Sequence, residues 1–326
     1  MKNSPTWRWS KLDPITHGLI GAAVSTIAGH PFNLNDPIFI GATLGAMMPD
    51  LDIVSHLKGR LNYLLKHRGK SHSLPALGLM SLGLSSLLHF FYPETSWNSI
   101  FFWTLAGTLS HGLIDVLNSF GAQLLWPFTK KKFTLNMITL SDPVIFSFFL
   151  AAAFLNHSQY ALQASVSAFA LSVIYLIAKQ YGRQQLKKMI MRIYKLQNKR
   201  EVKILPALYK PFSWNFLIVQ DHQVRIGTIR RHHPQIERVL PNWDQADPYI
   251  ATAMDGALAE VFDQFTPYYH VVPEYDQERT VNFVDLRYWG KDDFLYSGQV
   301  RMNDSGEIAQ ETFYLFPNRD GILLSY

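Results

Sequence analysis

The distribution of lysine and arginine over the first 200 residues constrains this chain more than any other feature. Six apolar segments alternate there with short polar connections. The connections that an even number of crossings places on one side hold 20 Lys and Arg residues, and the opposite connections hold none. Because positive charge gathers on the cytoplasmic face of membrane proteins, this pattern predicts a multi-pass membrane protein with both termini in the cytoplasm.

The apolar segments differ in length. The third, fourth and sixth approach the roughly 20 residues that a helix needs to cross a bilayer. The first two are short, so they are either tilted spans or a re-entrant pair that enters and leaves on one face. We therefore expect a bundle of about six apolar helices, covering residues 15–29, 38–48, 73–92, 99–117, 143–155 and 161–178.

The composition agrees with a membrane location, since 48% of the residues are apolar and only 17% are charged. A soluble helical bundle with basic loops is the alternative, but it gives no reason for the charge to fall on alternate connections. The net charge of +5 would suit either nucleic acid or lipid headgroups. No nucleic-acid-binding motif is present, so we expect the lipid bilayer as a partner and no nucleic acid.

From about residue 201 the sequence changes to that of an ordinary soluble domain. Alternating apolar residues predict strands at 212–219, 224–229, 280–288 and 312–316, and residues 244–265 have the pattern of an amphipathic helix. We expect residues 1–200 to form the membrane-embedded metal-binding domain. Residues 201–326 should form a small cytoplasmic α+β domain of mainly antiparallel type.

Histidine and aspartate residues gather at the ends of the apolar segments. With the topology above, every one of these ends lies on the cytoplasmic side. The topology was derived from Lys and Arg alone, so the agreement is independent. The clusters are Asp13 to His17, Pro49 to Asp52, His67 to His72, His111 to Asn118, and Ser141 to Pro143.

The spacing within these clusters suits metal binding. His111 and Asp115 are four residues apart, so on a helix they share one face. Asp50 and Asp52 are two apart and point the same way in an extended segment. The chain has no Cys, so imidazoles and carboxylates must be the ligands, which favours zinc, with manganese or iron as alternatives. The predicted multinuclear site consists of His17, Asp50, Asp52, His67, His72, His111 and Asp115.

Several of these residues also have a purely structural interpretation. His17 could be a packed or capping histidine, and Asp142 beside a proline has a common helix-cap pattern. Asp115 is harder to explain, because an Asp at a bilayer centre costs about 2.5–3.5 kcal/mol and its apolar segment contains no Lys or Arg. A metal ion would supply the missing positive charge. Arg68 and Lys70 could supply it instead, which would make a plain salt-bridge network.

These motifs resemble those of the membrane-bound metal-dependent hydrolases of bacteria, the YdjM-type proteins also described as LexA-binding inner-membrane hydrolases. The resemblance covers roughly residues 11–145 and rests on four motifs in order, at 13–17, 45–52, 67–73 and 111–118. Ser71 stands where threonine is expected. The resemblance implies a metal-dependent hydrolase of the bacterial inner membrane and implies little about its substrate.

The residues themselves suggest the chemistry. Divalent ions held by His and Asp activate water for hydrolysis, so we expect Asp52 and Asp115 to act in catalysis and Arg68 to bind a phosphate. A site at the membrane surface favours a phosphoester or lipid-linked phosphate as substrate. One alternative is a non-catalytic, metal-stapled scaffold or sensor whose tail recruits a cytoplasmic partner. The other is a transporter, which would need ionisable residues near the bilayer midplane instead of in one layer.

Overall fold

The computed structural model describes residues 13–52, 61, 65, 67–208, 210–230, 233–242, 247–274, 279–290, 293–315 and 321–324. The chain divides into two compact units, residues 1–182 with 209–211, and residues 183–208 with 212–326. The division falls inside one helix, α8 (Ala161–Ile193), ahead of the boundary predicted near residue 200. The last turns of that helix belong to the second unit, where Ile190 packs against Val202 and Phe216.

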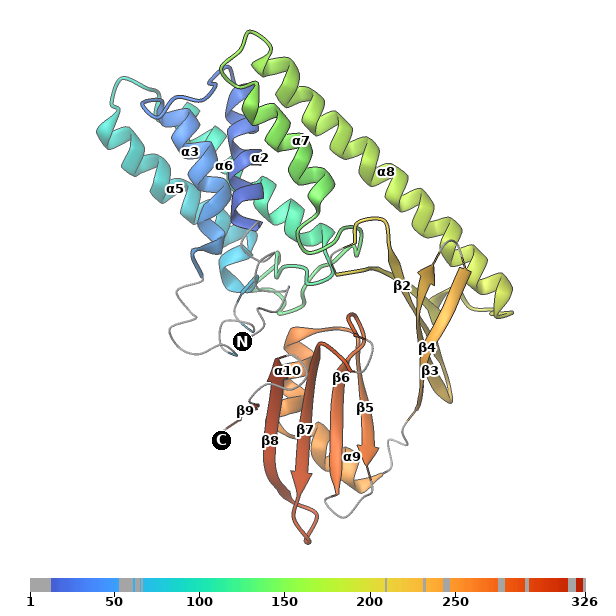
Figure 1. Ribbon diagram of the computed structural model, residues 1–326. Coiled ribbons are helices and arrows are strands. Elements are labelled where there is room, and N and C mark those ends of the chain that lie inside the picture. The colour runs from blue at the N-terminus through green and yellow to red at the C-terminus, as the bar shows by residue number, and fades with distance from the viewer. Residues whose placement is uncertain are drawn as a thin grey trace, which may run out of the picture. The chain divides into compact units, whose positions relative to one another are not determined.

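The first unit is a bundle of apolar helices (Figure 1). Three of them, α5, α6 and α8, are long and apolar enough to cross a membrane, whereas α2, α3 and α7 have 15, 11 and 12 residues. An 11-residue helix is about 16 Å long, roughly half of a bilayer's hydrocarbon core. Six membrane helices are therefore not confirmed, although each predicted apolar segment is helical. The bounds are α2 (Asp13–Ile27), α3 (Pro37–Met47), α5 (Leu74–Phe91), α6 (Trp97–Leu117) and α7 (Pro143–Phe154).

The helices of this unit run side by side, and the turns that connect them lie at the two ends of the bundle (Figure 1). The turns that follow α2, α5 and α7 lie together at one end of the bundle. The start of α2 and the ends of α3 and α6 lie at the other end. This up-and-down arrangement carries the clusters at 13–17, 49–52 and 111–118 to the same end, because each of them flanks one of those helix ends.

Small residues let α3 pack closely against α2 and α6. A Cβ added to Gly107 of α6 would collide with the carbonyl oxygen of Ala42 in α3, and one added to Gly45 would lie 2.8 Å from the carbonyl oxygen of Thr104. Close backbone approach through glycine and alanine is typical of helices that pack in a membrane. Since Asp50 follows α3, this contact also sets where that carboxylate lies relative to α6.

Asp142 caps α7. Its carboxylate accepts a hydrogen bond from the Val144 main-chain N–H at 3.0 Å, and Pro143 occupies the first helical turn. The Tyr175 hydroxyl donates to the same carboxylate at 3.0 Å, and Lys179 Nζ lies 3.8 Å from it. These contacts agree with the interpretation of Asp142 as a helix cap.

The second unit is an antiparallel α+β structure with two sheets. The first sheet has the order β1-β2-β3-β4 and the second the order β5-β6-β7-β8-β9. The strands are β1 (Val202–Pro206), β2 (Trp214–Gln220), β3 (Gln223–Arg230), β4 (His233–Pro241), β5 (Tyr269–Glu274), β6 (Thr280–Asp285), β7 (Tyr296–Met302), β8 (Ile308–Leu315) and β9 (Ile322–Leu323).

Two helices, α9 (Pro248–Met254) and α10 (Ala257–Phe265), precede the second sheet. Phe262 of α10 packs against Phe283 of β6 and Phe313 of β8, which buries one face of that sheet. The buried Glu311 carboxylate accepts the main-chain N–H groups of Ala257 and Leu258 and so fixes the start of α10.

The structure corrects several details predicted for the tail. Strands 212–219 and 224–229 correspond to β2 and β3, but 280–288 ends as β6 at Asp285, and residue 316 lies outside the described residues. The single helix expected over 244–265 is two helices, because Gly256 separates them and has no room for a side chain beside Glu311. Residues 244–246 are not among those described.

Candidate metal centre

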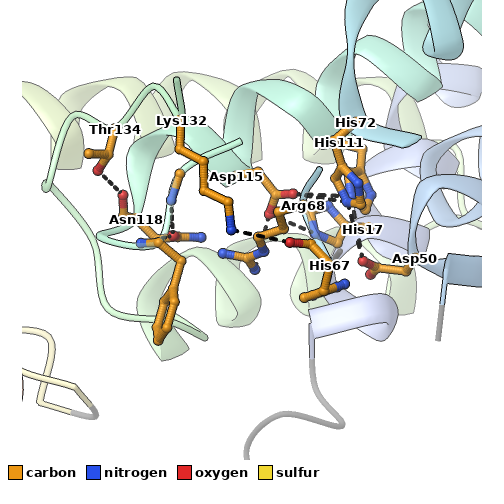
Figure 2. A network of polar contacts seen from close by, with 12 residues as sticks. His17, Asp50, His67, Arg68, His72, His111, Asp115, Asn118, Lys132 and Thr134 are labelled. Carbon is orange, nitrogen blue, oxygen red and sulfur yellow. Dashed lines mark hydrogen bonds and ion pairs between the residues drawn. The ribbon is translucent and has the colours of Figure 1, made fainter. Parts of the chain in front are cut away.

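The predicted site residues come from four places in the first unit (Figure 2). His17 lies in the first turns of α2, and Asp50 and Asp52 lie in the turn after α3. His67 and His72 come from the segment before α5. The last turns of α6 supply His111 and Asp115, one helical turn apart.

Four of these side chains form a fully buried inner cluster. His17, His72, His111 and Asp115 are each at most 1% exposed. One Asp115 oxygen, Oδ2, lies 3.3 Å from His72 Nε2 and 3.4 Å from His111 Nε2. The other, Oδ1, lies 3.9 Å from His17 Nε2. The His17 and His111 rings stack with centroids 3.8 Å apart.

Asp50 joins the inner cluster from the other side. Its Oδ1 lies 3.7 Å from both His72 Nε2 and His111 Nε2. Within the described residues, three triads place one ligand atom of each member within 4.8 Å of the others. Because Asp50, His72 and His111 are each shared by two triads, the arrangement suits adjacent ions more than a single one. The triads are His17–Asp50–His111, Asp50–His67–His72 and His72–His111–Asp115.

Hydrogen bonds behind the imidazoles decide which ring nitrogen faces the cluster. His111 Nδ1 donates to the main-chain carbonyl of Ala46 at 2.8 Å, so the proton sits on Nδ1 and the Nε2 lone pair points inward. His72 Nδ1 lies 2.9 Å from the Ser71 hydroxyl, on the side away from the cluster. Metal-ligating histidines are commonly oriented by such contacts to the second nitrogen.

The inward-facing atoms lack hydrogen bonds. His72 Nε2, His111 Nε2 and both oxygens of Asp115 accept or donate none within the part of the chain that the structure describes. A buried polar group without a hydrogen bond costs about 1–3 kcal/mol, and a charged one costs more. A divalent cation would satisfy His72 Nε2, His111 Nε2 and one oxygen of Asp115 together, so the residues fit a metal centre.

Arg68 is the one basic side chain of the set that contacts Asp115. Its Nη2 lies 3.1 Å from Asp115 Oδ1, and the residue is buried with φ near +60°. Lys70 contributes differently, since its Nζ lies over the Trp126 ring, 5.2 Å from the ring centroid. Of the two basic residues in the salt-bridge alternative, Arg68 therefore pairs with Asp115, whereas Lys70 contacts Trp126. The ion pair leaves the inward nitrogens of His72 and His111 without hydrogen bonds.

Asp52 lies one step outside the inner cluster. Its Oδ1 accepts from His67 Nδ1 at 2.8 Å and its Oδ2 accepts from the Ser71 hydroxyl at 3.0 Å. Asp52 belongs to none of the three triads of described residues. Through these contacts Asp52 can orient the histidines of the site. A direct bond from Asp52 to a metal stays a prediction.

The charge states of Asp50 and His72 suit cation binding. Burial alone would raise the pKa of Asp50, but the imidazoles of His72, His111 and His17 hold that pKa below its usual range. Burial lowers the pKa of His72, although the Asp50 and Asp115 carboxylates act in the opposite direction. An ionised carboxylate and a neutral imidazole are the forms that bind divalent metals.

The cluster becomes more exposed toward His67, whose side chain is 22% accessible. Lys132 Nζ donates to the main-chain carbonyl of His67 at 3.4 Å, and Figure 2 shows its side chain reaching over this side of the site. Arg68, which pairs with Asp115, and Lys132, which bonds to the main chain of His67, place positive charge at this edge of the site. An anionic ligand would find compensating charge at this edge.

The sequence pattern missed two groups that shape the site, the Ser71 hydroxyl and the Ala46 carbonyl. Ser71 stands next to His72 within the recognised motif, so its position was a usable signal. The Ala46 carbonyl belongs to the last turn of α3, where main-chain oxygens lack partners within the helix. No residue pattern reveals which side chain will use such an oxygen.

The fold and the site together define a class. An apolar helical unit with a His/Asp cluster at one end, followed by an antiparallel α+β unit, is a membrane protein with a candidate metal centre. The chain belongs to the YdjM inner membrane protein family, whose model matches residues 12–186, more than half of the chain. This confirms the resemblance drawn from the four motifs.

The second unit also has a match, since the YfhP C-terminal alpha/beta plait domain corresponds to residues 248–318. The Bacillus subtilis (strain 168) protein YfhP, described as uncharacterized, is 28% identical over 304 residues, which cover 89% of this chain and 91% of the relative. The similarity therefore extends through both units. No solved structure gives a significant match.

Proposed function

We propose that the chain is a membrane-bound metal-dependent hydrolase that acts on a phosphoester or lipid-linked phosphate. The observation that carries the proposal is the set of buried, inward-facing atoms on His72, His111 and Asp115 that make no hydrogen bonds among the described residues. Such atoms are costly unless a cation binds them. Their donor types favour zinc, with manganese or iron as alternatives.

Divalent ions held here would activate water and neutralise charge on an attacked phosphoryl oxygen. The residues of the chain divide the remaining work. The inner histidines and Asp115 would hold the cations at a buried site, and Asp50 is shared by two of the three triads. Arg68 supplies a planar guanidinium suited to a phosphate, although in this structure it pairs with Asp115.

The substrate class follows from where the site lies. The cluster sits at the ends of α3 and α6, and α6 is long and apolar enough to cross a membrane. A substrate bound there would have its phosphate at Arg68 and Lys132, and its apolar part could stay in the bilayer. A phospholipid or an isoprenoid phosphate meets both conditions.

A non-catalytic scaffold is the second candidate, and the ion pair between Arg68 and Asp115 favours it. In that reading, Arg68 neutralises Asp115, and a metal ion held by the cluster only staples α2, α5 and α6 together. The two candidates differ in what the purified protein does with phosphoesters.

The test is elemental analysis of the detergent-purified protein, followed by hydrolysis assays on water-soluble phosphodiesters, phosphatidic acid and an isoprenoid phosphate. We expect at least one equivalent of zinc, manganese or iron, and phosphate release that a chelator abolishes and metal restores. Replacing His111 with Ala should remove both. Bound metal without turnover of any phosphoester would support the scaffold, and absence of metal after reconstitution would contradict both metal readings.

A further inference from the structure

A chain of three polar groups lies behind His72. The Ser71 hydroxyl oxygen is 2.9 Å from His72 Nδ1 and 3.0 Å from Asp52 Oδ2. A serine has one hydroxyl hydrogen, and an ionised carboxylate can only accept. Both contacts are satisfied only if Ser71 donates to Asp52 and accepts from a protonated His72 Nδ1. The lone pair of His72 is then on Nε2, which faces Asp115 Oδ2 at 3.3 Å.

The hydroxyl is a necessary bridge in this chain. The direct separation between His72 Nδ1 and Asp52 Oδ2 is 3.6 Å, too long for a hydrogen bond. Asp52 also accepts from His67 Nδ1 at 2.8 Å, so one carboxylate orients two imidazoles. Without the hydroxyl, His72 could move its proton to Nε2 and donate to Asp115, which would take the lone pair out of the cluster.

We propose that Ser71 is a positioning residue which, together with Asp52, holds His72 in the Nδ1–H tautomer and so presents Nε2 to a divalent cation. The cation comes from the proposed function, but the tautomer is a property of the metal-free protein and can be measured by itself. His111 offers an internal comparison, because a main-chain carbonyl fixes its tautomer and no side-chain substitution removes that carbonyl.

The test uses the full-length protein in detergent with Ser71→Ala, Ser71→Thr and Ser147→Ala. Thr keeps the hydroxyl, and Ser147 is a matched control in the same unit, whose hydroxyl donates to the Pro143 carbonyl of its own helix. Nitrogen-15 NMR of the histidine rings in the metal-free protein reports the tautomer of His72. Competition titration with Zn²⁺ reports affinity.

We expect Ser71→Ala to lose the Nδ1–H tautomer of His72 while the His111 signals stay in place. Zn²⁺ affinity should fall about 10- to 100-fold, the range found when groups that orient metal ligands are removed. Ser71→Thr should restore both properties to within about 2-fold of the wild type, a range far smaller than the expected loss. Ser147→Ala should change neither property.

Two results would overturn the proposal. One is an unchanged His72 tautomer in Ser71→Ala. The other is an equal loss of Zn²⁺ affinity in Ser71→Ala and Ser71→Thr, because the hydroxyl would then not be the cause. If the wild-type protein binds no metal, the proposed function fails, and the tautomer measurement still decides the role of Ser71.

Discussion

Asp115 is a fully buried carboxylate, and either Arg68 or a metal ion could compensate its charge. The 3.1 Å contact with Arg68 accounts for one oxygen, whereas the other faces the Nε2 atoms of His72 and His111. Removing one partner of a buried ion pair is costly because it strands the other charge. The two explanations therefore predict opposite responses when both residues are changed.

Replacing Asp115 with Asn keeps the size of the side chain and removes its charge. We expect metal affinity and any phosphoester hydrolysis to fall about 10-fold or more while the fold survives, because a ligand is lost. Asp142→Asn is the matched control, since it changes a buried carboxylate that caps α7 and should lower thermal stability without affecting metal. Metal content and the unfolding midpoint are measured for both variants.

A different result would assign Asp115 to a salt bridge. If Asp115→Asn keeps its metal and loses thermal stability, and Arg68→Gln in the same chain restores that stability, the carboxylate is half of an ion pair. The coupling between the two changes is then the quantity to report, since neither single variant isolates it.

Residue spacing could predict only part of this site. The interval of four between His111 and Asp115 places both on one face of a helix, whatever the rest of the fold does. Asp52 was expected to face the metal together with Asp50, because side chains two residues apart point the same way in an extended segment. The turn at 48–52 is helical instead, and Asp52 contacts His67 and Ser71. Local pattern cannot reveal such tertiary partners.

At the scale of elements, the contact between α3 and α6 determines the geometry of the site. Replacing Gly107 with Ala would push a methyl group into the Ala42 carbonyl, so the two helices must separate. We expect a loss of about 1–3 kcal/mol of stability, as overpacking generally costs, together with weaker metal binding because Asp50 moves with α3. Thermal unfolding in detergent and Zn²⁺ titration measure the two effects.

Gly78→Ala is the control for this substitution. Gly78 lies in α5, and a Cβ there would meet no atom within 4 Å. Alanine favours a helix by up to about 1 kcal/mol over glycine, so this variant should be at least as stable as the wild type. Similar losses in both variants would contradict the close-packing explanation.

His270 in β5 gives the second unit a pH-dependent stability. Its Nε2 donates to the Pro241 carbonyl of β4 at 2.9 Å, and burial lowers its pKa below 6.5. Well above pH 6.5 the residue is neutral in both the folded and the unfolded chain. Below that pH the unfolded chain binds more protons, so stability falls with falling pH. The unfolding midpoint of the second unit should therefore drop between pH 7.5 and 5.5.

The slope of that drop is the diagnostic quantity. His270→Asn should flatten it even if the variant is less stable overall, whereas His222→Asn changes an exposed histidine and should leave it unchanged. An equal slope in the wild type and His270→Asn would mean that other groups cause the pH dependence.

The elements of the two units differed in how well they could be predicted. The apolar helices follow from hydrophobicity alone, because in a membrane every exposed helix face is apolar. The tail strands β1, β4, β5, β7 and β9 escaped prediction. For β4, burial alternates only between half-buried and exposed residues, so the strand lacks the strong apolar alternation that reveals a buried face.

For the whole molecule, sidedness is the property that joins the fold to the proposed function. The connections without Lys or Arg follow α2, α5 and α7, and these turns lie together at one end of the bundle (Figure 1). The His/Asp cluster lies at the ends of α3 and α6 instead. The charge pattern predicts that the cluster faces the cytoplasm, which is where a metal supply and the second unit would both be available.

Reporter fusions at residues 95, 157 and 326 test this topology. Alkaline phosphatase is active only outside the cytoplasm and green fluorescent protein only inside it. We expect residues 95 and 157 to report outside, since their turns lack basic residues, and residue 326 to report inside. Residue 157 is the most informative position, because α7 has only 12 residues and is about 18 Å long. It can cross the bilayer only if the turns at its two ends also lie within the membrane. If 95 and 326 report the same side, an odd number of crossings between them is excluded, and the cluster cannot be assigned to the cytoplasmic face.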